Sequence, residues 1–259
     1  MLSHDINPII FRIGFMQVTW YAFVYLIGFI VALFILLKAS KKKEINITEN
    51  EVYDFVFLGI IFMMLGARLF HVLFWGVDYY FQNPIKIFHV WEGGLSFHGG
   101  LFALLVFTAI YTKVKKINFW KLADILALLG VIMPAFSRVA NFVNQEIVGT
   151  ITNVPWCFEF KYHKGCRHPV QLYASAGRLA LFACLVYIKR KLKEFKEGFI
   201  FWLFIFGIGL GRFILDFWRQ DEIFHGLKAG QWLSLIMVFI SLFALAEKHW
   251  KDVKKLFKK

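Results

Sequence analysis

The chain has 259 residues, of which 59% are hydrophobic and only 18% are charged. Soluble domains have about 45–50% apolar and about 25% charged residues. This composition, with a mean hydropathy of +0.61, excludes a water-soluble globule, and it also excludes a disordered chain. The net charge of +13 does not indicate a nucleic-acid partner, because too little polar surface remains for a domain that reads a groove. It is typical of a membrane protein with basic cytoplasmic loops.

Seven segments are long and apolar enough to be transmembrane helices, which need about 20 mostly apolar residues. In chain order they cover approximately residues 18–37, 53–75, 95–111, 122–139, 170–188, 199–218 and 231–246. We therefore predict an all-α integral membrane protein with seven transmembrane helices. In this prediction residues 1–259 form a single polytopic membrane domain, with one outer polar segment at about 141–169.

Lysine and arginine are distributed unevenly between the two sides of the predicted bundle. Of the 30 basic residues, 19 lie in the segments that follow the first, third, fifth and seventh helices. Loops rich in lysine and arginine stay in the cytoplasm. The pattern therefore places the N-terminus outside and the C-terminus in the cytoplasm.

Several ionisable side chains lie within the predicted helices, toward the outer half of the bundle. Arg138 lies at the outer end of the fourth helix, and His98 lies near the outer end of the third. Arg212 and Asp216 are four residues apart in the sixth helix, so they share one face, and Arg219 follows at its outer end. Ionisable groups inside a membrane are costly, and they mark candidate functional sites by default.

Three polar blocks surround these residues. Residues 93–101 place four glycines around one histidine, which lets a ligand or a neighbouring helix approach closely; the alternative is a packing site of small residues. Residues 137–149 hold two Asn, one Glu and one Arg at the outer interface; the alternative is a polar helix cap. Residues 167–173 open the fifth helix with a proline, and a purely structural helix start explains them equally well.

The residue types in these blocks suit an anionic ligand. Arginine has a planar fork that matches phosphate oxygens, so several arginines at one membrane interface predict a phospholipid headgroup. Histidine is the side chain best suited to transfer a proton near neutral pH. No motif for a metal or a nucleotide occurs, and we expect neither a metal nor a cofactor. Cys157 and Cys166 share the outer polar segment and can pair if it faces an oxidising compartment.

A set of short motifs follows in order along nearly the whole chain. They are Trp20-Tyr21, Tyr25-Leu26-Ile27-Gly28-Phe29, Gly66-Ala67-Arg68, Gly94-Leu95-Ser96-Phe97-His98-Gly99-Gly100-Leu101, Arg138, Asn141-Phe142-Val143-Asn144, Glu146, Gly149, Pro155-Trp156, Arg167-His168-Pro169, Gln171-Leu172-Tyr173, Arg212, Phe217, Arg219-Gln220 and Gly230-Gln231. With these motifs the sequence resembles the prolipoprotein diacylglyceryl transferase family of bacterial membrane enzymes.

The resemblance implies a multi-pass transferase of the bacterial cytoplasmic (inner) membrane that performs the first step of lipoprotein maturation. Phosphatidylglycerol would donate its diacylglyceryl group to the thiol of the lipobox cysteine of a prolipoprotein. A thioether would form and glycerol 1-phosphate would leave. The implied partners are phosphatidylglycerol, prolipoproteins and the lipid bilayer. Such chemistry needs a bound phosphate, an activated thiol and stabilisation of charge on the leaving phosphate.

The resemblance also implies roles for individual residues. Arg138 would bind the phosphatidylglycerol headgroup, and Arg212 would stabilise the leaving phosphate. His98 would accept the thiol proton or hold the lipid. The further substrate-binding residues that we expect are Tyr21, Gly99, Gly100, Asn141, Asn144, Glu146, Gly149, Asp216 and Arg219.

Four positions depart from the family pattern. Ser137 and Ala140 stand where glycine is usual, and the acidic residue of the sixth helix is the shorter Asp216. Ala174 replaces the glutamate that usually follows Gln-Leu-Tyr, and the lost carboxylate favours one alternative, a divergent homologue that binds phospholipid without this activity. A small-solute transporter is another alternative, although the sequence lacks the internal repeats common in transporters.

Overall fold

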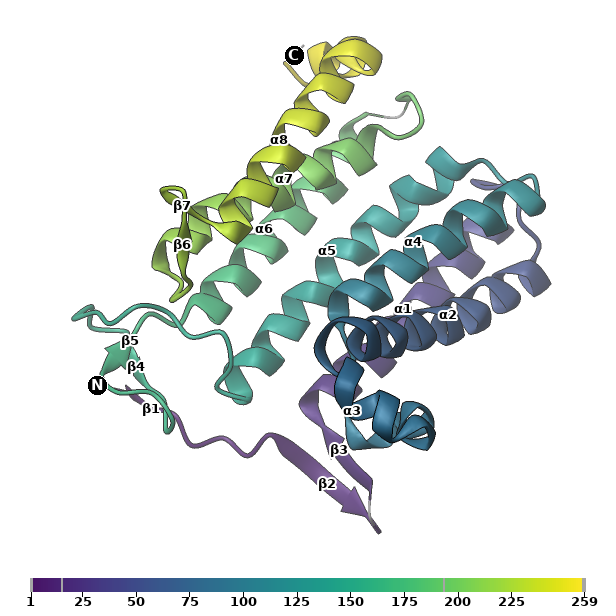
Figure 1. Cartoon of the computed structure of the whole chain (residues 1–259). Helices are drawn as coiled ribbons and strands as arrows, with labels where there is room; N and C mark the ends of the chain where they lie inside the picture. The colour runs from purple at the N-terminus through teal and green to yellow at the C-terminus, as the bar shows by residue number, and fades with distance from the viewer. Residues whose placement is uncertain (1, 15, 193, 258–259) are drawn as a thin grey trace. The chain divides into compact units, whose positions relative to one another are not determined.

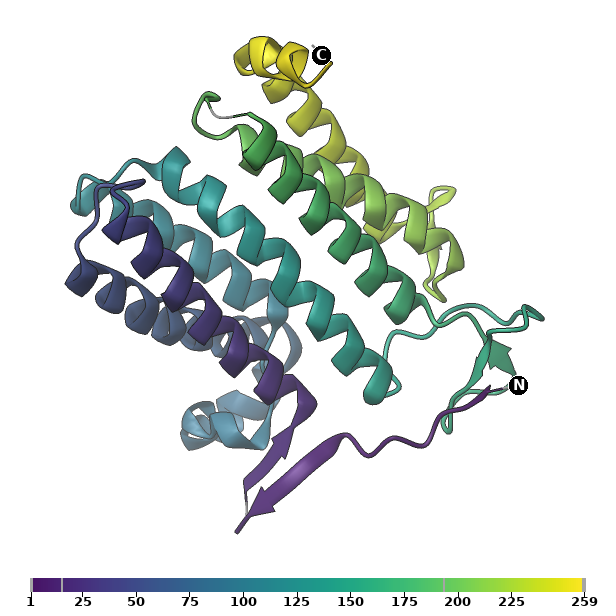
Figure 2. The same cartoon turned by 180° about the vertical axis from the view of Figure 1, so that it is seen from behind.

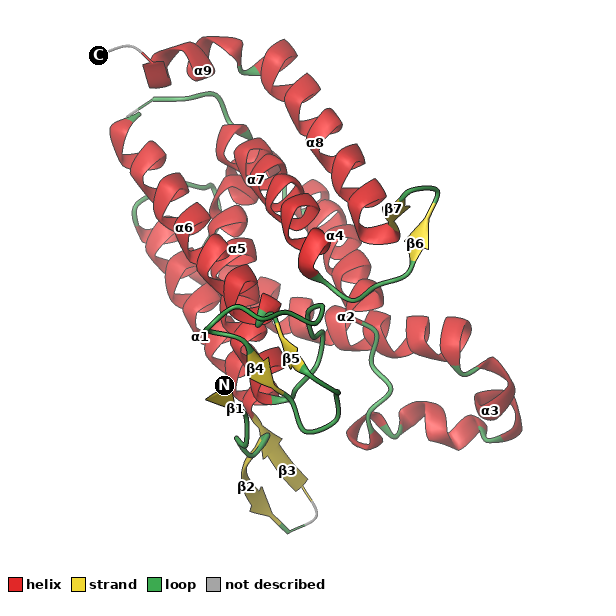
Figure 3. Cartoon of the chain, turned by 90° about the vertical axis from the view of Figure 1, so that its left-hand side faces the viewer, coloured by secondary structure: helices red, strands yellow, loops and turns green. Residues whose placement is uncertain are grey.

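The computed structural model of the protein describes residues 2–14, 16–192 and 194–257. The fold is mostly helical (Figure 3). The chain divides into two compact units, one formed by residues 1–28 and 123–259 and the other by residues 29–122. Helices α1 and α5 each continue from one unit into the other. A single membrane domain over the whole chain stays a prediction.

The described residues form nine α-helices, which Figure 1 shows in chain order by colour. They are α1 (Trp20–Lys41), α2 (Glu49–Trp75), α3 (Val77–Gln82), α4 (Phe97–Val114), α5 (Phe119–Val143), α6 (Val170–Lys191), α7 (Phe199–Leu215), α8 (Ala229–Lys248) and α9 (Trp250–Phe257). The short 3₁₀ helices are η1 (Pro84–Phe88), η2 (Val90–Glu92) and η3 (Asp216–Trp218). The strands are β1 (Leu2–Ser3), β2 (Ile9–Ile13), β3 (Met16–Thr19), β4 (Phe158–Glu159), β5 (Cys166–Arg167), β6 (Ile223–Phe224) and β7 (Leu227–Lys228).

Six of the described helices are long and apolar enough to cross a membrane, namely α1, α2, α5, α6, α7 continued through η3, and α8. The segment expected at 95–111 corresponds to α4, whose apolar part over His98–Val114 is shorter. Large apolar side chains such as Phe34, Phe57 and Phe239 are exposed on these helices, as a lipid-facing surface requires. The prediction of a helical multi-pass membrane protein is therefore confirmed. A seventh span and the sidedness of the termini stay predictions.

In the first unit α6 and α8 both pack against α7 (Figures 1 and 2). The buried side chains that form the centre of this packing include Leu185, Phe199 and Ile200. Asp124 of α5 holds the start of α7, because its carboxylate accepts hydrogen bonds from the amides of Gly198 at 2.7 Å and Phe201 at 2.8 Å. The first amides of a helix have no partner within the helix, and Asp124 supplies one from outside.

In the second unit α2 packs closely against α4. A Cβ atom on Gly66 would collide with the Cβ of Ala103 and the carbonyl of Gly99, and one on Gly99 would collide with Phe70. Small residues at such positions let two helix backbones approach each other. The spacing between α2 and α4 therefore depends on these glycines.

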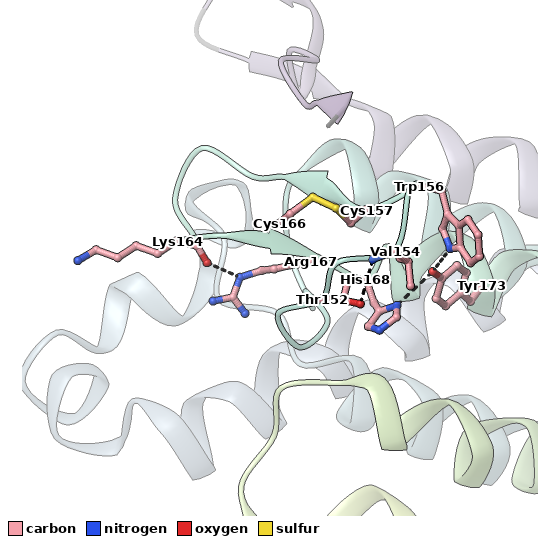
Figure 4. Close-up of a disulfide and its surroundings, with 9 residues drawn as sticks. All are labelled: Thr152, Val154, Trp156, Cys157, Lys164, Cys166, Arg167, His168 and Tyr173. Carbon is pink, nitrogen blue, oxygen red and sulfur yellow. Dashed lines mark hydrogen bonds between the residues drawn. A yellow bond between two sulfur atoms is a disulfide. The ribbon is translucent and has the colours of Figure 1, made fainter.

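The N-terminal strand β1 is attached to the polar segment at about 141–169 by a small sheet. Strand β1 pairs in parallel with β4, and β4 pairs antiparallel with β5. A disulfide joins Cys157 and Cys166 across this hairpin (Figure 4), so the pairing that the sequence left open is present. His4 follows β1, and its buried ring contacts Phe142 and Phe160. The His4 ring therefore fastens the N-terminal arm to the end of α5.

We expect acid to weaken the attachment of this arm. Neither ring nitrogen of His4 has a hydrogen-bond partner among the described residues. Burial lowers the pKa of the His4 imidazole below its ordinary value of 6.5, although the backbone of His4, the charge of the nearby Asp5 and the backbone of Phe142 oppose this effect. The neutral ring therefore stabilises the folded arm above pH 6.5, and this contribution is lost as the pH falls through the lowered pKa.

The measurement is thermal unfolding in detergent at pH 7.5 and at pH 5 for the wild type and His4→Phe. The wild type should lose more stability on acidification, by about 1.4 kcal/mol for each unit of pKa shift. Identical pH responses of the two proteins would contradict a titrating role for His4.

Candidate functional site

A polar network gathers at the C-terminal end of α5, in the first unit. Asn141 is its centre and is almost completely buried. Its side-chain oxygen accepts a hydrogen bond from Nη1 of Arg138 at 2.9 Å, and its amide donates to Oε2 of Glu146 at 2.8 Å and to the hydroxyl of Tyr21. Asn144 donates to the other oxygen of Glu146 at 3.2 Å. The structure thus joins five of the residues expected in a substrate site.

The turn after α5 holds the Glu146 carboxylate toward this network. Gln145 and Ile147, on either side of Glu146, have positive φ angles of 59° and 55°. Such angles are unfavourable for residues other than glycine, and most of all for a β-branched one, so surrounding contacts must hold the turn. The Glu146 amide donates to the carbonyl of Asn141 at 2.9 Å, and buried Gln171 of α6 donates to the Glu146 carbonyl at 2.6 Å.

Gly149 lies where the outer polar segment crosses the start of α6. A Cβ atom here would collide with the carbonyl and the Cβ of His168, so only glycine fits. The Gly149 carbonyl accepts a hydrogen bond from Nη1 of Arg167 at 3.0 Å. Arg167 also donates to the carbonyl of Lys164 at 3.1 Å (Figure 4) and to the side chain of Gln220. Close packing therefore explains Gly149, and its place in a substrate site stays a prediction.

A buried carboxylate organises the end of α7. Asp216 has no exposed surface. Its Oδ2 lies 2.9 Å from Nε of Arg212, and its Oδ1 lies 3.5 Å from Nη1 of Arg219. Arg219 also contacts the carboxylate of Asp221 at 3.2 Å. Arg212 and Asp216, which the spacing placed on one helix face, thus form an ion pair. The Asp216 carboxylate pairs with two guanidinium groups, those of Arg212 and Arg219.

The start of α8 packs directly against this ion pair. Lys228 donates from Nζ to the carbonyl oxygens of Asp216 and Arg219. At Gly230 a Cβ atom would collide with Oδ2 of Asp216 and Nη2 of Arg212. No role for Lys228 or Gly230 could be predicted from the sequence, because neither contact is local in the chain.

Four arginines gather in this part of the first unit. Arg138 interacts electrostatically with Arg212 and Arg219, and Arg178 of α6 interacts with Arg138 and Arg212. Burial and the nearby Arg212 lower the pKa of the Arg219 guanidinium. Arg178 was not among the predicted site residues, although an arginine inside an apolar helix is itself a signal of a functional site. Among the described residues, no three His, Cys, Asp or Glu side chains are grouped as a metal site would require.

In the second unit the buried Arg68 organises the glycine-containing loop before α4. Its Nε donates to the carbonyl of Ile87 at 2.8 Å, and its Nη1 donates to those of Gly93 at 2.6 Å and Gly94 at 3.0 Å. Gly93 and Gly94 have φ angles of 90° and 71°, which favour glycine. Arg68 therefore acts as a structural centre around which the loop folds.

This loop leads into the first turn of α4, which carries His98. Ser96 caps the helix by accepting a hydrogen bond from the amide of Gly99 at 3.4 Å, and the His98 side chain is exposed. Gly99 and Gly100 are buried against α2. Close helix packing explains both glycines, and their contact with lipid stays a prediction.

Comparisons with known proteins agree on one family. A family model described as "Prolipoprotein diacylglyceryl transferase" matches residues 8–246. A protein of Geobacter sulfurreducens named phosphatidylglycerol–prolipoprotein diacylglyceryl transferase is 39% identical over 244 residues, which cover 92% of this chain and 93% of that protein. Proteins of the same name from Pasteurella multocida and Polynucleobacter necessarius are 37% and 32% identical. These matches cover 88% and 95% of this chain, and 85% and 97% of the respective relatives.

We predict that Gly230→Ala disrupts the ion pair at the end of α7. The added methyl group has no space beside Asp216 and Arg212, and overpacking of this kind costs about 1–3 kcal/mol. The matched control is Gly177→Ala on α6, where a Cβ would meet no atom within 4 Å. The control should be neutral or slightly stabilising, because alanine favours a helix more than glycine does. Thermal unfolding in detergent measures both, and equal effects would contradict the prediction.

Proposed function

Because this chain belongs to the prolipoprotein diacylglyceryl transferase family, we propose that it transfers the diacylglyceryl group of phosphatidylglycerol to the lipobox cysteine of a prolipoprotein. The thiol sulfur forms a bond to the terminal glyceryl carbon. The bond between that carbon and the phosphate oxygen breaks, and glycerol 1-phosphate leaves. The thiol proton passes to a base. The product is a thioether, and the reaction is the first step of bacterial lipoprotein maturation.

The observation that carries this proposal is the excess of guanidinium groups in the first unit. Of the four arginines, Arg212 and Arg219 share the buried Asp216, and Arg219 also contacts Asp221. Among the described residues, Arg138 and Arg178 have no carboxylate in an ion pair, although both lie close enough to Arg212 to repel it. The leaving glycerol phosphate is a monoester, so it carries more negative charge than the diester from which it forms. Fixed positive groups in a water-poor site stabilise charge that develops during a reaction. The arrangement therefore favours release of a phosphate.

The geometry gives the two central arginines separate tasks. Arg138 is oriented by its hydrogen bond to Asn141, which leaves a planar fork to span two oxygens of a headgroup phosphate. Arg212 is oriented by Asp216 and would stabilise the leaving phosphate. Arg219 follows η3, directly after the α7 helix that carries Arg212, and would guide the anionic headgroup inward. The polar wall around the headgroup would comprise Tyr21, Asn141, Asn144, Glu146 and Gly149.

We assign the proton transfer to His98. Histidine is the side chain best suited to transfer a proton, and His98 is exposed on the first turn of α4. The other role open to it is to hold the lipid together with Gly99 and Gly100. A histidine accepts the thiol proton through a ring nitrogen that carries no proton.

We further propose seven spans in the bacterial cytoplasmic membrane, with the N-terminus outside. The 18 residues of α4 extend about 27 Å, close to the ~30 Å of the hydrocarbon layer. The Cys157–Cys166 disulfide suits an outer, oxidising side, and the basic loops suit the cytoplasm. A reporter fused after Lys259 should read cytoplasmic, and an external signal would contradict this topology.

The activity can be tested with the purified chain in vesicles that contain phosphatidylglycerol. A peptide with a lipobox cysteine should gain a diacylglyceryl thioether, and glycerol 1-phosphate should appear in equal amount. The same peptide with serine in place of the cysteine should gain nothing. Formation of neither product from the cysteine peptide would overturn the proposed activity.

In the same assay we predict that Arg138→Ala lowers the transfer rate by about 100-fold or more, as loss of one donor to a developing anion does. Arg138→Lys should recover only part of the rate, because an ammonium group cannot bind Asn141 and two phosphate oxygens in one plane. Both variants should be compared with the wild type per folded molecule. A rate for Arg138→Ala within twofold of the wild type would remove Arg138 from the site.

A further inference from the structure

Arg178 is a half-buried arginine of the first unit to which neither the motifs nor the family resemblance assigns a role. It lies in α6, where its Nη1 donates to the carbonyl of Ala174, one turn earlier, at 3.1 Å. Its Nε is buried and has no hydrogen-bond partner. Among the described residues no carboxylate forms an ion pair with Arg178, whereas Arg212 has Asp216. The Arg178 guanidinium is therefore only partly satisfied.

The position of Arg178 makes this arrangement costly for the free protein. It lies eight residues beyond the first residue of α6, Val170, which corresponds to about 12 Å along the helix. A cation at that depth in an apolar helix requires a counter-charge. The charged groups that act on Arg178 are instead two further cations, Arg138 and Arg212. The three guanidinium groups therefore act on one another, and of these three only Arg212 forms an ion pair with a carboxylate among the described residues.

We propose that Arg178 is a third phosphate-binding guanidinium of this site and that it acts mainly on the leaving glycerol phosphate. This inference rests on the proposed transferase function. The bound lipid is a phosphodiester with one negative charge, and Arg138 and Arg212 are sufficient to hold it. The departing monoester carries close to two negative charges. Its second negative charge would balance the positive charge of Arg178. Arg178 therefore contributes more to turnover than to the affinity for phosphatidylglycerol.

Ala174 is the feature that keeps Arg178 available. The two residues are four apart on α6, so they lie on the same face of the helix. The Arg178 guanidinium already contacts the Ala174 backbone, so an acidic side chain at position 174 would reach it. Such a carboxylate would form an ion pair with Arg178 whether or not a phosphate is bound. With alanine at position 174, the phosphate is left to provide the negative charge.

The test compares four variants for the rate of transfer from phosphatidylglycerol vesicles to a lipobox peptide, per folded molecule. Arg178→Gln should lower kcat by about 10- to 100-fold, with a smaller change in KM for the lipid. Ala174→Glu should lower kcat similarly by pairing with Arg178, whereas the isosteric but neutral Ala174→Gln should lower it far less. Arg190→Gln, at the exposed end of α6, is the matched control and should leave kcat unchanged.

A second measurement separates charge from packing. In the double variant Ala174→Gln with Arg178→Gln, the loss should not exceed that of Arg178→Gln alone, because the neutral change at position 174 adds no charge. A merely structural Arg178 would instead show lower thermal stability with an unchanged kcat per folded molecule. That result, or equal losses in Ala174→Glu and Ala174→Gln, would overturn the inference.

Binding of glycerol 1-phosphate, measured by calorimetry on the detergent-solubilised chain, does not depend on activity. Arg178→Gln should bind it about tenfold more weakly than the wild type, as loss of a charged hydrogen bond implies. If the wild type transfers no lipid, the proposed function fails, and this binding difference still decides the role of Arg178. Equal binding by the wild type and Arg178→Gln would overturn that role.

Discussion

The buried carboxylate of Asp216 is the interaction on which the arrangement of the first unit's arginines depends. It has no exposed surface, and it meets Arg212 from α7 and Arg219 from the segment that follows η3. A buried carboxylate is stable only when cations and donors surround it, so Asp216 fixes both guanidinium groups in place. Lys228 binds the carbonyl oxygens of Asp216 and Arg219 and so ties the start of α8 to the same point.

Backbone features bring the helix ends close enough for these contacts. Gly230 lets α8 approach the ion pair, and Gly149 lets the outer segment cross the start of α6. At the end of α5, the two positive φ angles around Glu146 turn its carboxylate back toward Asn141. A side chain at Gly149 or Gly230 would remove the close approach at that glycine, and relaxation of the turn around Glu146 would move its carboxylate away from Asn141. The positions of the polar side chains therefore depend on backbone conformation at residues other than the arginines.

The parts of the fold and site that follow local rules could be predicted from the sequence. Apolar length indicated the helices, and a spacing of four placed Arg212 beside Asp216. Contacts between distant segments carry no such local signal. Asn141 meets Tyr21 across 120 residues, and the sequence grouped these two only through the family resemblance.

The disulfide and the end of α4 also could not be predicted from the sequence. The disulfide between Cys157 and Cys166 was left open, because pairing depends on the compartment and on the β4–β5 hairpin. Helix α4 continues to Val114, beyond the expected end near residue 111. The expected end was placed where the apolar run stops, but the polar residues Thr112 and Lys113 still belong to the helix. Hydropathy reports where a chain meets lipid and does not report where a helix ends.

The excess of positive charge also bears on which lipid the site accepts. In the proposed site, Arg138, Arg178 and Arg212 outnumber the one buried carboxylate that pairs with them, Asp216, so a bound anion would balance the excess charge. Phosphatidylglycerol has a neutral glycerol head and supplies one net negative charge. A zwitterionic lipid supplies the same phosphate, but it brings an ammonium group close to the arginines, where like charges repel. We infer that the repulsion of this second charge, together with the attraction for phosphate, directs the site toward an anionic donor.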